Sequence, residues 1–322
     1  MGFFRRLFGS EVKSVVAPVK IETRPEPVGT RQSFSSEIFE IPSRRFMGLC
    51  VRSSNGRFTL TWNDNFTGRS KYFLLRGNQI VAVGTLARPN DGAVADNGTF
   101  IFNKWGTGEG LKGTFRAFNE AGELLIAKKL AANLFNNGLS SDGRYAAVQT
   151  ANAPGSDDSG VLTVFDLIQR AQIGRFVPQS GWADQYRFYD DGTIELGYQK
   201  LGFFRYSLDG EFIDHGLWEE AQLTSGDYSM TLITVQRILK NRGGKPDLDL
   251  TVRLIEAIDR VTPLIVKEHE KTKALAKRLR GECLEVRGDR AAALASYREA
   301  LSIDPKVGVK RQIDRLTKAG ES

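Results

Sequence analysis

Few residues of this chain have the types and spacing that enzymatic chemistry needs. Its two histidines, His215 and His269, lie far apart and outside any cysteine–histidine pattern, so neither zinc binding nor a histidine-based triad is expected. The carboxylate pairs Asp157-Asp158 and Asp190-Asp191 are the best candidates for metal binding or acid–base catalysis. Adjacent residues of a strand point to opposite faces, however, so neither pair directs two carboxylates at one substrate. We interpret these aspartates as turn and loop residues, and we predict no catalytic residue, metal site or cofactor.

One glycine pattern formally matches the dinucleotide-binding fingerprint. Gly108, Gly110 and Gly113 have the spacing that, in that motif, precedes a helix whose N-terminus holds pyrophosphate. Here the next residues, 114–118, read Thr-Phe-Arg-Ala-Phe, which is typical of a strand. We therefore interpret the glycines as part of a loop between strands. With this motif set aside, the sequence predicts a protein that is not an enzyme.

A repeated turn-and-strand pattern occupies the first two thirds of the chain. Each unit has an asparagine or aspartate followed by a glycine, which accepts positive φ in a tight hairpin. The glycines are Gly56, Gly98, Gly143 and Gly192, and they recur every 42–49 residues, a period expected of propeller blades. Hydrophobic residues stand two and four positions after each glycine, with the period of a half-buried strand. We expect these eight side chains in the core: Phe58, Leu60, Phe100, Phe102, Tyr145, Ala147, Ile194 and Leu196.

The third unit carries a resemblance to a known family. Its residues 141–145, Ser-Asp-Gly-Arg-Tyr, run on to Val-Phe-Asp-Leu at 164–167. This resembles a WD-repeat blade, with Phe165 where that family usually has tryptophan. The resemblance implies a WD-repeat-like β-propeller of four degenerate units, as a four-bladed ring or an incomplete larger one. Residues 33–41 are a candidate strand for a terminal blade, and a β-sandwich with coincidental turns is the alternative fold.

Helical periodicity replaces the strand pattern from Leu217 onward. Residues 273–305 resemble one tetratricopeptide repeat, and the matching positions are Gly281, Leu284, Gly288, Ala293, Tyr297, Ala300 and Pro305. Gly281 and Ala293 let two antiparallel helices approach closely, while Tyr297 fills the groove between them. One such unit cannot bury its own hydrophobic faces, so it must pack on neighbouring helices. Apolar spacing predicts these at 228–240, 248–266 and 309–316.

The fold class that follows is multidomain β plus α: a β-propeller-like repeat domain, then an all-helical tetratricopeptide-like domain of about five helices. We expect a flexible leader and tether at 1–32, the propeller-like domain at 33–216 and the helical domain at 217–322. Cys50 and Cys283 fall in different domains, which disfavours a disulfide and favours a reducing compartment.

A short basic-aromatic patch lies near the start of the sequence. Such a patch is compatible with a lipid interface or a partner surface, but it lacks the apolar core of a signal peptide. No apolar run approaches the roughly 20 residues that span a bilayer. We expect a cytoplasmic protein, with a weak peripheral membrane or partner contact through this patch as an option beside a disordered leader. The patch consists of Phe3, Phe4, Arg5, Arg6, Leu7 and Phe8.

Two groups of charged residues are predicted to bind partners. Lys273, Lys277 and Arg280 lie on one predicted helix and suit an acidic peptide or helix, and Asp157-Asp158 lies in a polar insertion of the propeller-like domain. The formal net charge of +7 is spread along the chain, and no nucleic-acid-binding pattern accompanies it. We predict a non-catalytic protein–protein interaction scaffold or adaptor subunit. The alternatives are a propeller-type hydrolase, or a nucleic-acid or membrane-surface adaptor that uses the basic helix and the N-terminal patch.

Overall fold

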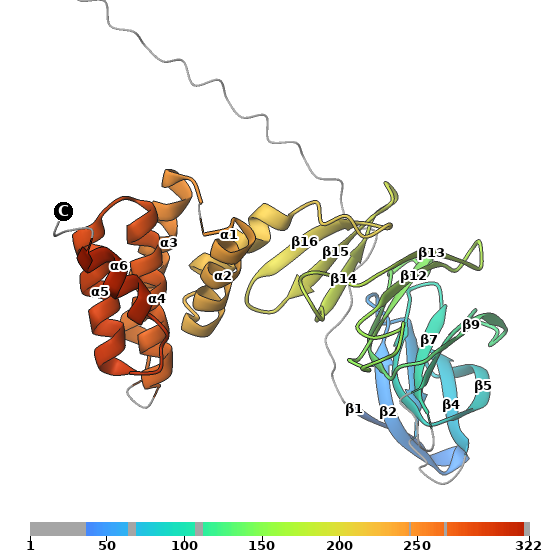
Figure 1. Ribbon diagram of the computed structural model, residues 1–322. Helices are drawn as coiled ribbons and strands as arrows, with labels where there is room; N and C mark the ends of the chain where they lie inside the picture. Colours follow the sequence, from blue (N-terminus) through green and yellow to red (C-terminus); the bar gives the residue numbers. More distant parts are fainter. Residues whose placement is uncertain (1–36, 64–68, 107–111, 245, 267–268, 319–322) are drawn as a thin grey trace, which may run out of the picture.

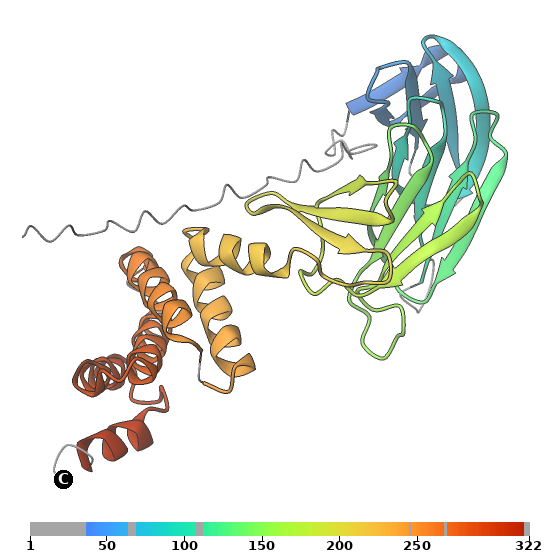
Figure 2. The same cartoon turned by 90° about the horizontal axis from the view of Figure 1, so that it is seen from above.

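The chain folds into a row of antiparallel sheets followed by a helical arm. The computed structural model describes residues 37–63, 69–106, 112–244, 246–266 and 269–318. Figure 1 shows the sheets on one side and helices α2 to α6 on the other, with α1 between them. In Figure 2 the sheets follow one another along a curve, with β1 and β2 at one end and β14 to β16 at the other. We call the four sheets the propeller-like domain and helices α2 to α6 the helical arm.

Sixteen strands form the four sheets in the described part of the chain, and in each sheet the strands pair in sequence order. The first sheet contains β1 (Glu37–Ile41), β2 (Phe46–Arg52), β3 (Phe58–Trp62), β4 (Arg69–Arg76) and β5 (Gln79–Ala87), with the 3₁₀ turn η1 (Pro42–Arg44) after β1. The second contains β6 (Pro89–Val94), β7 (Phe100–Trp105), β8 (Gly113–Phe118) and β9 (Leu124–Leu130). The third contains β10 (Leu134–Leu139), β11 (Tyr145–Thr150), β12 (Leu162–Asp166) and β13 (Ala171–Phe176), and the fourth β14 (Gln185–Phe188), β15 (Thr193–Tyr198) and β16 (Gly202–Ser207).

The repeated glycines make the hairpin turns that the sequence predicts. Gly56, Gly98, Gly143 and Gly192 have φ between +71° and +84°, a conformation that side chains with a Cβ rarely adopt. Each glycine joins two paired strands, of which the first is β2, β6, β10 or β14. We call these four the inner strands. The strand predicted after Gly113 is also present, as β8, so the glycine fingerprint does not precede a helix.

Hydrophobic layers between neighbouring sheets hold the row together. All eight residues predicted to be core are buried, and they divide among the layers. Phe58, Leu60, Phe100 and Phe102 pack between the first and second sheets, and Tyr145, Ala147, Ile194 and Leu196 pack between the third and fourth. In the middle layer the rings of Phe115 and Phe165 stack with centroids 4.9 Å apart. This arrangement of sheets is propeller-like, as predicted.

The two ends of the row differ from the blades between them. β1 adds a strand beyond inner strand β2, with Ile38 opposite Leu49, so part of the candidate segment 33–41 does extend a terminal blade. The fourth sheet has only three strands. Beyond β16, Phe212 forms a single bridge with Tyr206, and α1 (His215–Thr224) contacts β16 where the other sheets have a fourth strand. Both additions cover edges that an open row would otherwise expose.

Six α-helices follow in the described residues, one more than the approximate number predicted. α1 begins at His215, so the boundary expected at 216/217 falls in its first turn. The arm contains α2 (Tyr228–Asn241), α3 (Leu248–Val261), α4 (Glu270–Val286), α5 (Arg290–Ile303) and α6 (Lys310–Lys318), with the 3₁₀ turn η2 (Thr262–Leu264) after α3. Asp227, Asp247 and Asp289 cap α2, α3 and α5 by accepting backbone N–H bonds. No described helix is both long and apolar enough to cross a bilayer.

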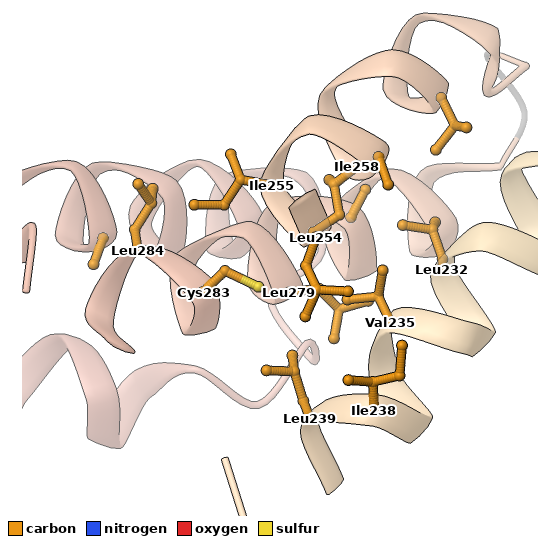
Figure 3. Close-up of a cluster of buried hydrophobic side chains, with 14 of the residues drawn as sticks. Leu232, Val235, Ile238, Leu239, Leu254, Ile255, Ile258, Leu279, Cys283 and Leu284 are labelled. Atoms are coloured by element: carbon orange, nitrogen blue, oxygen red, sulfur yellow. The ribbon is translucent and has the colours of Figure 1, made fainter. Parts of the chain in front are cut away.

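The helical arm has one continuous hydrophobic core. Figure 3 shows Val235 of α2, Leu254 of α3 and Leu279 of α4 gathered in it, with Cys283 at its side. Along α4, a Cβ built on Gly281 would lie 2.6 Å from the ring of Tyr297 on α5. The ring therefore packs against bare backbone, which is the close approach that the sequence predicts for these two positions.

The buried tyrosines should make the protein sensitive to alkali. Burial, and then hydrogen bonding to a carboxylate, raises the pKa of Tyr145 and of Tyr189 from 10.0 to about 12. The folded state thus favours the neutral phenols. Their contribution to stability is full below pH 10 and is lost as the pH rises toward about 12. Urea midpoints measured across this range should fall as tyrosinate absorbance rises. Complete ionisation of the tyrosines near pH 10 in a fully folded protein would contradict the raised pKa values.

Candidate binding surfaces

The basic residues predicted to bind an acidic partner are used inside the helical arm. Lys277 Nζ lies 2.8 Å from Glu299 Oε1 on α5, and Arg280 Nε lies 2.7 Å from Asp259 Oδ1 on α3. Lys273, also on α4, is half-buried. An acidic partner at this helix would have to compete with these internal carboxylates. The binding role of the three residues stays a prediction.

The predicted acidic pair lies in a loop that is tied to its own domain. Asp158 Oδ2 accepts a bond of 2.6 Å from the Ala131 N–H, and its Oδ1 lies 2.9 Å from Arg175 Nη2. Burial alone would raise the pKa of Asp158, but these two donors hold it below its usual value. The carbonyl of Asp157 accepts from the same guanidinium at 2.8 Å. These contacts fix the loop, and its proposed partner remains a prediction.

The other candidates separate in space or lie outside the described residues. Asp190 Oδ1 accepts from Arg144 Nη1 at 2.7 Å, while Asp191 Oδ1 accepts from Thr193 within its own turn. His215 is paired with Glu219 at 3.9 Å, and His269 Nδ1 lies 3.1 Å from the Tyr228 hydroxyl in the arm. Within the described ranges, no three His, Cys, Asp or Glu side chains gather as metal ligands. The N-terminal patch from Phe3 to Phe8 lies outside the described residues.

Three large aromatic side chains, which the sequence analysis missed, gather at one end of the sheets. Trp105 is 42% exposed, Phe135 53% and Trp182 44%. Trp105 ends β7, Phe135 is the second residue of β10, and Trp182 comes three residues before β14. Because β7 runs antiparallel to β6, with Lys104 opposite Pro89, all three lie where the inner strands begin. We call Trp105, Phe135 and Trp182 the aromatic surface.

Hydrogen bonds between sheets orient the two indoles of the aromatic surface. Trp105 Nε1 donates to the Leu134 carbonyl at 2.9 Å, which joins the second sheet to the third. Trp182 Nε1 donates to the Thr150 carbonyl at 2.8 Å, and its ring centroid lies 5.8 Å from that of Phe135. The polar edges of the indoles are thus satisfied within the protein. What remains exposed is the apolar face of each ring, held in place before any partner arrives.

A second surface is an acidic cavity of about 600 Å³ in the helical arm. Glu282 and Glu285 of α4 line one side, and Leu239, Val286 and Tyr297 provide apolar walls. Burial raises the pKa of Glu282, although an ion pair with Arg278 opposes the shift. The cavity therefore holds carboxyl groups that are partly removed from water, beside hydrophobic side chains.

Among known proteins, the chain is similar to proteins of solved structure, and the similarity is one of fold. No family model and no curated protein matches the chain. The chain is similar to WD40 β-propeller domains. For the C-terminal WD40 domain of Sif2 the identity is 14%, the coverage 56% of this chain and 46% of that one, and the TM-score 0.30.

Further solved structures share the similarity at the same level. The WD40 β-propeller domain of Doa1 is 9% identical over 47% of this chain and 51% of that one, with a TM-score of 0.27. A putative 6-phosphogluconolactonase from Bacteroides fragilis is 16% identical over 50% and 53%, also with a TM-score of 0.27. The chain spans about a third to a half of the solved structures that it matches. The propeller-like description rests on the four sheets of this chain itself.

The aromatic surface of the propeller-like domain had a weak signal in the sequence. Trp105 and Trp182 are two of the four tryptophans, and in the structure Trp105 ends β7 while Trp182 precedes β14. Trp62 also ends a strand, β3, and is buried in the core, so a position at a strand end does not by itself identify a surface ring. The periodicity could not show that Phe135 and Trp182, 47 positions apart, would meet, because that depends on how the sheets are arranged.

Proposed function

We propose that this protein is a non-catalytic interaction scaffold that holds a protein partner on the aromatic surface. The observation that carries the proposal is the pair of half-exposed rings, Phe135 and Trp182, set beside each other by contacts between sheets. Rigid aromatic side chains bury a large apolar area at little entropic cost, which is why they dominate the energetics of protein interfaces. A partner that covers them would displace water from apolar surface that the fold itself leaves open.

Two finer features belong to the same proposal. The units of the propeller-like domain are degenerate WD-repeat-like blades, and the α4–α5 hairpin is a tetratricopeptide-like unit. The second assignment is supported by the packing of Tyr297 against the bare backbone of Gly281 and by the burial of Ala293 and Ala300. Both kinds of repeat present extended surfaces on which other proteins bind. An adaptor with one partner on the sheets and another on the arm fits this construction.

The test replaces one exposed ring and measures how much of the partner protein co-purifies with the chain. Tagged full-length chains carrying Phe135→Ser or Ile168→Ser are purified from the native cells after nuclease treatment, and co-purifying proteins are quantified against the wild type. Ile168 is 74% exposed in the turn after β12, at the opposite end of the sheets, and serves as the matched control. We expect Phe135→Ser to reduce a stoichiometric partner about tenfold or more, as loss of an interface hot spot does.

Loss of the partner from Phe135→Ser alone supports the aromatic surface, provided that both variants keep the thermal midpoint of the wild type. Equal recovery of the partner with both variants would assign binding to another surface. A wild-type chain that co-purifies with no stoichiometric protein would contradict the scaffold proposal.

A further inference from the structure

The second sheet, β6 to β9, carries charges of opposite sign at its two ends. Where β6 finishes, the turns hold three carboxylates: Asp96, Glu120 and Glu123. Where β6 begins, beside the aromatic surface, stand three lysines: Lys104, Lys112 and Lys129. Asp91 lies at that same end but is only 3% exposed. We call Lys104, Lys112 and Lys129 the lysine group.

Strand pairing brings the lysine group together and joins it to the aromatic surface. Lys104 of β7 lies opposite Thr114 of β8, and Thr114 lies opposite Lys129 of β9. Directly paired residues share one face of a sheet, so the two lysines project on the same side, with Cα atoms roughly 10 Å apart. Lys112 stands immediately before β8, whose first residue pairs with Trp105. The lysine group therefore adjoins the aromatic surface at Trp105.

No internal ion pair neutralises the lysine group. Among the described residues, Lys277 of the helical arm is the one lysine with a carboxylate oxygen within 4.0 Å. Lys112 and Lys129 are exposed, and Lys104 is half-buried. Arg88, just before β6, adds a further cation, and its Nη1 donates to the Gly106 carbonyl at 3.1 Å. The charges of the lysine group are thus available to an acidic ligand.

The third sheet limits how far a ligand's negative charge can extend across this end of the domain. Its loop between β11 and β12 carries Asp157, which is exposed, and Asp158, which pairs with Arg175. A nucleic acid has a phosphate at every nucleotide, so a strand that crossed the aromatic surface from the lysine group would bring phosphates toward these carboxylates. A peptide can confine its carboxylates to the lysine group and place apolar side chains elsewhere. This arrangement favours an acidic peptide over a nucleic acid.

We propose that the partner contributes an extended segment with two parts: apolar side chains that cover Phe135 and Trp182, and aspartate or glutamate side chains that pair with the lysine group. This inference rests on the proposed function, because it specifies the partner of the same surface. Neighbouring sheets pack about 10 Å apart and an extended residue spans about 3.3 Å, so about three to six residues separate the two parts. Charge pairs at the rim of an interface contribute to partner choice, whereas the buried rings contribute most of the affinity.

The experiment measures binding of synthetic peptides to the full-length chain by fluorescence anisotropy. Each peptide joins a leucine–tryptophan–leucine block, through a glycine–serine linker of three to six residues, to a block of three glutamates, glutamines or lysines, in either order. We expect the best glutamate peptide to bind about tenfold more tightly than its glutamine counterpart, and the lysine peptide to bind most weakly. Equal affinities of the glutamate and glutamine peptides would overturn the inference. A thymidine oligonucleotide that bound more tightly than every glutamate peptide would also overturn it and would assign the surface to nucleic acid.

Charge variants locate the preference for glutamate. The double variant Lys104→Glu, Lys112→Glu should abolish it, and the milder Lys104→Gln, Lys112→Gln should reduce it if the charge reversal folds poorly. The matched control is Lys306→Glu, Lys310→Glu, which changes the net charge by the same amount at two exposed lysines of the helical arm. A preference that persists in both lysine-group variants with native thermal midpoints, or that disappears in the control, would overturn the site.

Phe135→Ser separates failure of this inference from failure of the proposed function. It should weaken every peptide about tenfold and leave the preference for glutamate unchanged. If Phe135→Ser weakened binding but glutamate gave no advantage, the aromatic surface would stand and the acidic requirement would be wrong. If Phe135→Ser changed the affinity of no peptide, the aromatic surface would be wrong, and this inference with it. Absence of binding by every peptide would overturn this inference alone, because the proposed function is tested by co-purification of a whole partner.

Discussion

Replacing Tyr297 with alanine should destabilise the helical arm by about 3–5 kcal/mol, the usual cost of truncating a fully buried aromatic side chain. The ring is buried in the core of the arm and lies against the bare backbone at Gly281. Gly281 has no side chain that could fill the space that the ring would vacate. The cost should appear as a large fall in the urea midpoint followed by helical circular dichroism.

Tyr297→Phe separates the ring from its hydroxyl. Phenylalanine keeps the packing on Gly281 and loses only the hydrogen bond to Glu285, so its effect should be clearly smaller, roughly 1–3 kcal/mol for a bond to a charged acceptor. If Tyr297→Ala and Tyr297→Phe lowered the midpoint equally, the ring would not be the element that joins α4 to α5. The far-ultraviolet signal of the sheets should change little in either variant.

The sequence predicted local structure well because the determining interactions are local. Asparagine or aspartate before glycine favours a hairpin, and Gly56, Gly98, Gly143 and Gly192 make the turns that this pattern predicts. The dipeptides Asp91-Gly92 and Asn137-Gly138 lie inside β6 and β10 instead. Period-two hydrophobicity then identified the buried face of each following strand. The pairing of Gly281 with Tyr297 was predictable for a similar reason, since both positions lie in one helical hairpin.

The candidate surfaces could not be predicted in the same way, because they are made between elements. Phe135 and Trp182 meet only after two sheets pack side by side, and the acidic cavity needs α2 and α6 on either side of α4. The basic residues predicted to bind a partner show a second limit of reasoning from sequence. Lys277 and Arg280 read as one charged face of a helix, whereas Glu299 and Asp259 arrive from neighbouring helices and neutralise them. A charge pattern on one helix carries no information about the charges packed against it.

Trp218 of α1 contacts both the fourth sheet and the helical arm. It is 4% exposed and belongs to the same hydrophobic cluster as the fourth sheet, with its ring centroid 5.6 Å from that of Phe212. On the other side the Arg237 guanidinium of α2 lies 4.4 Å from the ring centroid, at cation–π distance. Sheet and arm thus contact the same indole.

Trp218→Ala should therefore release the arm from the sheets while each part keeps its own core. The expected cost is about 3–5 kcal/mol at the joint, so limited proteolysis between residues 208 and 228 should accelerate roughly a hundredfold or more. Leu217→Ala is the matched control, because Leu217 is adjacent to Trp218 in the sequence but is 57% exposed. Equal cleavage rates for the two variants would show that the indole does not hold the joint. Accelerated cleavage in Trp218→Ala alone would mean that the relative placement of the aromatic surface and the acidic cavity is set by a single buried contact.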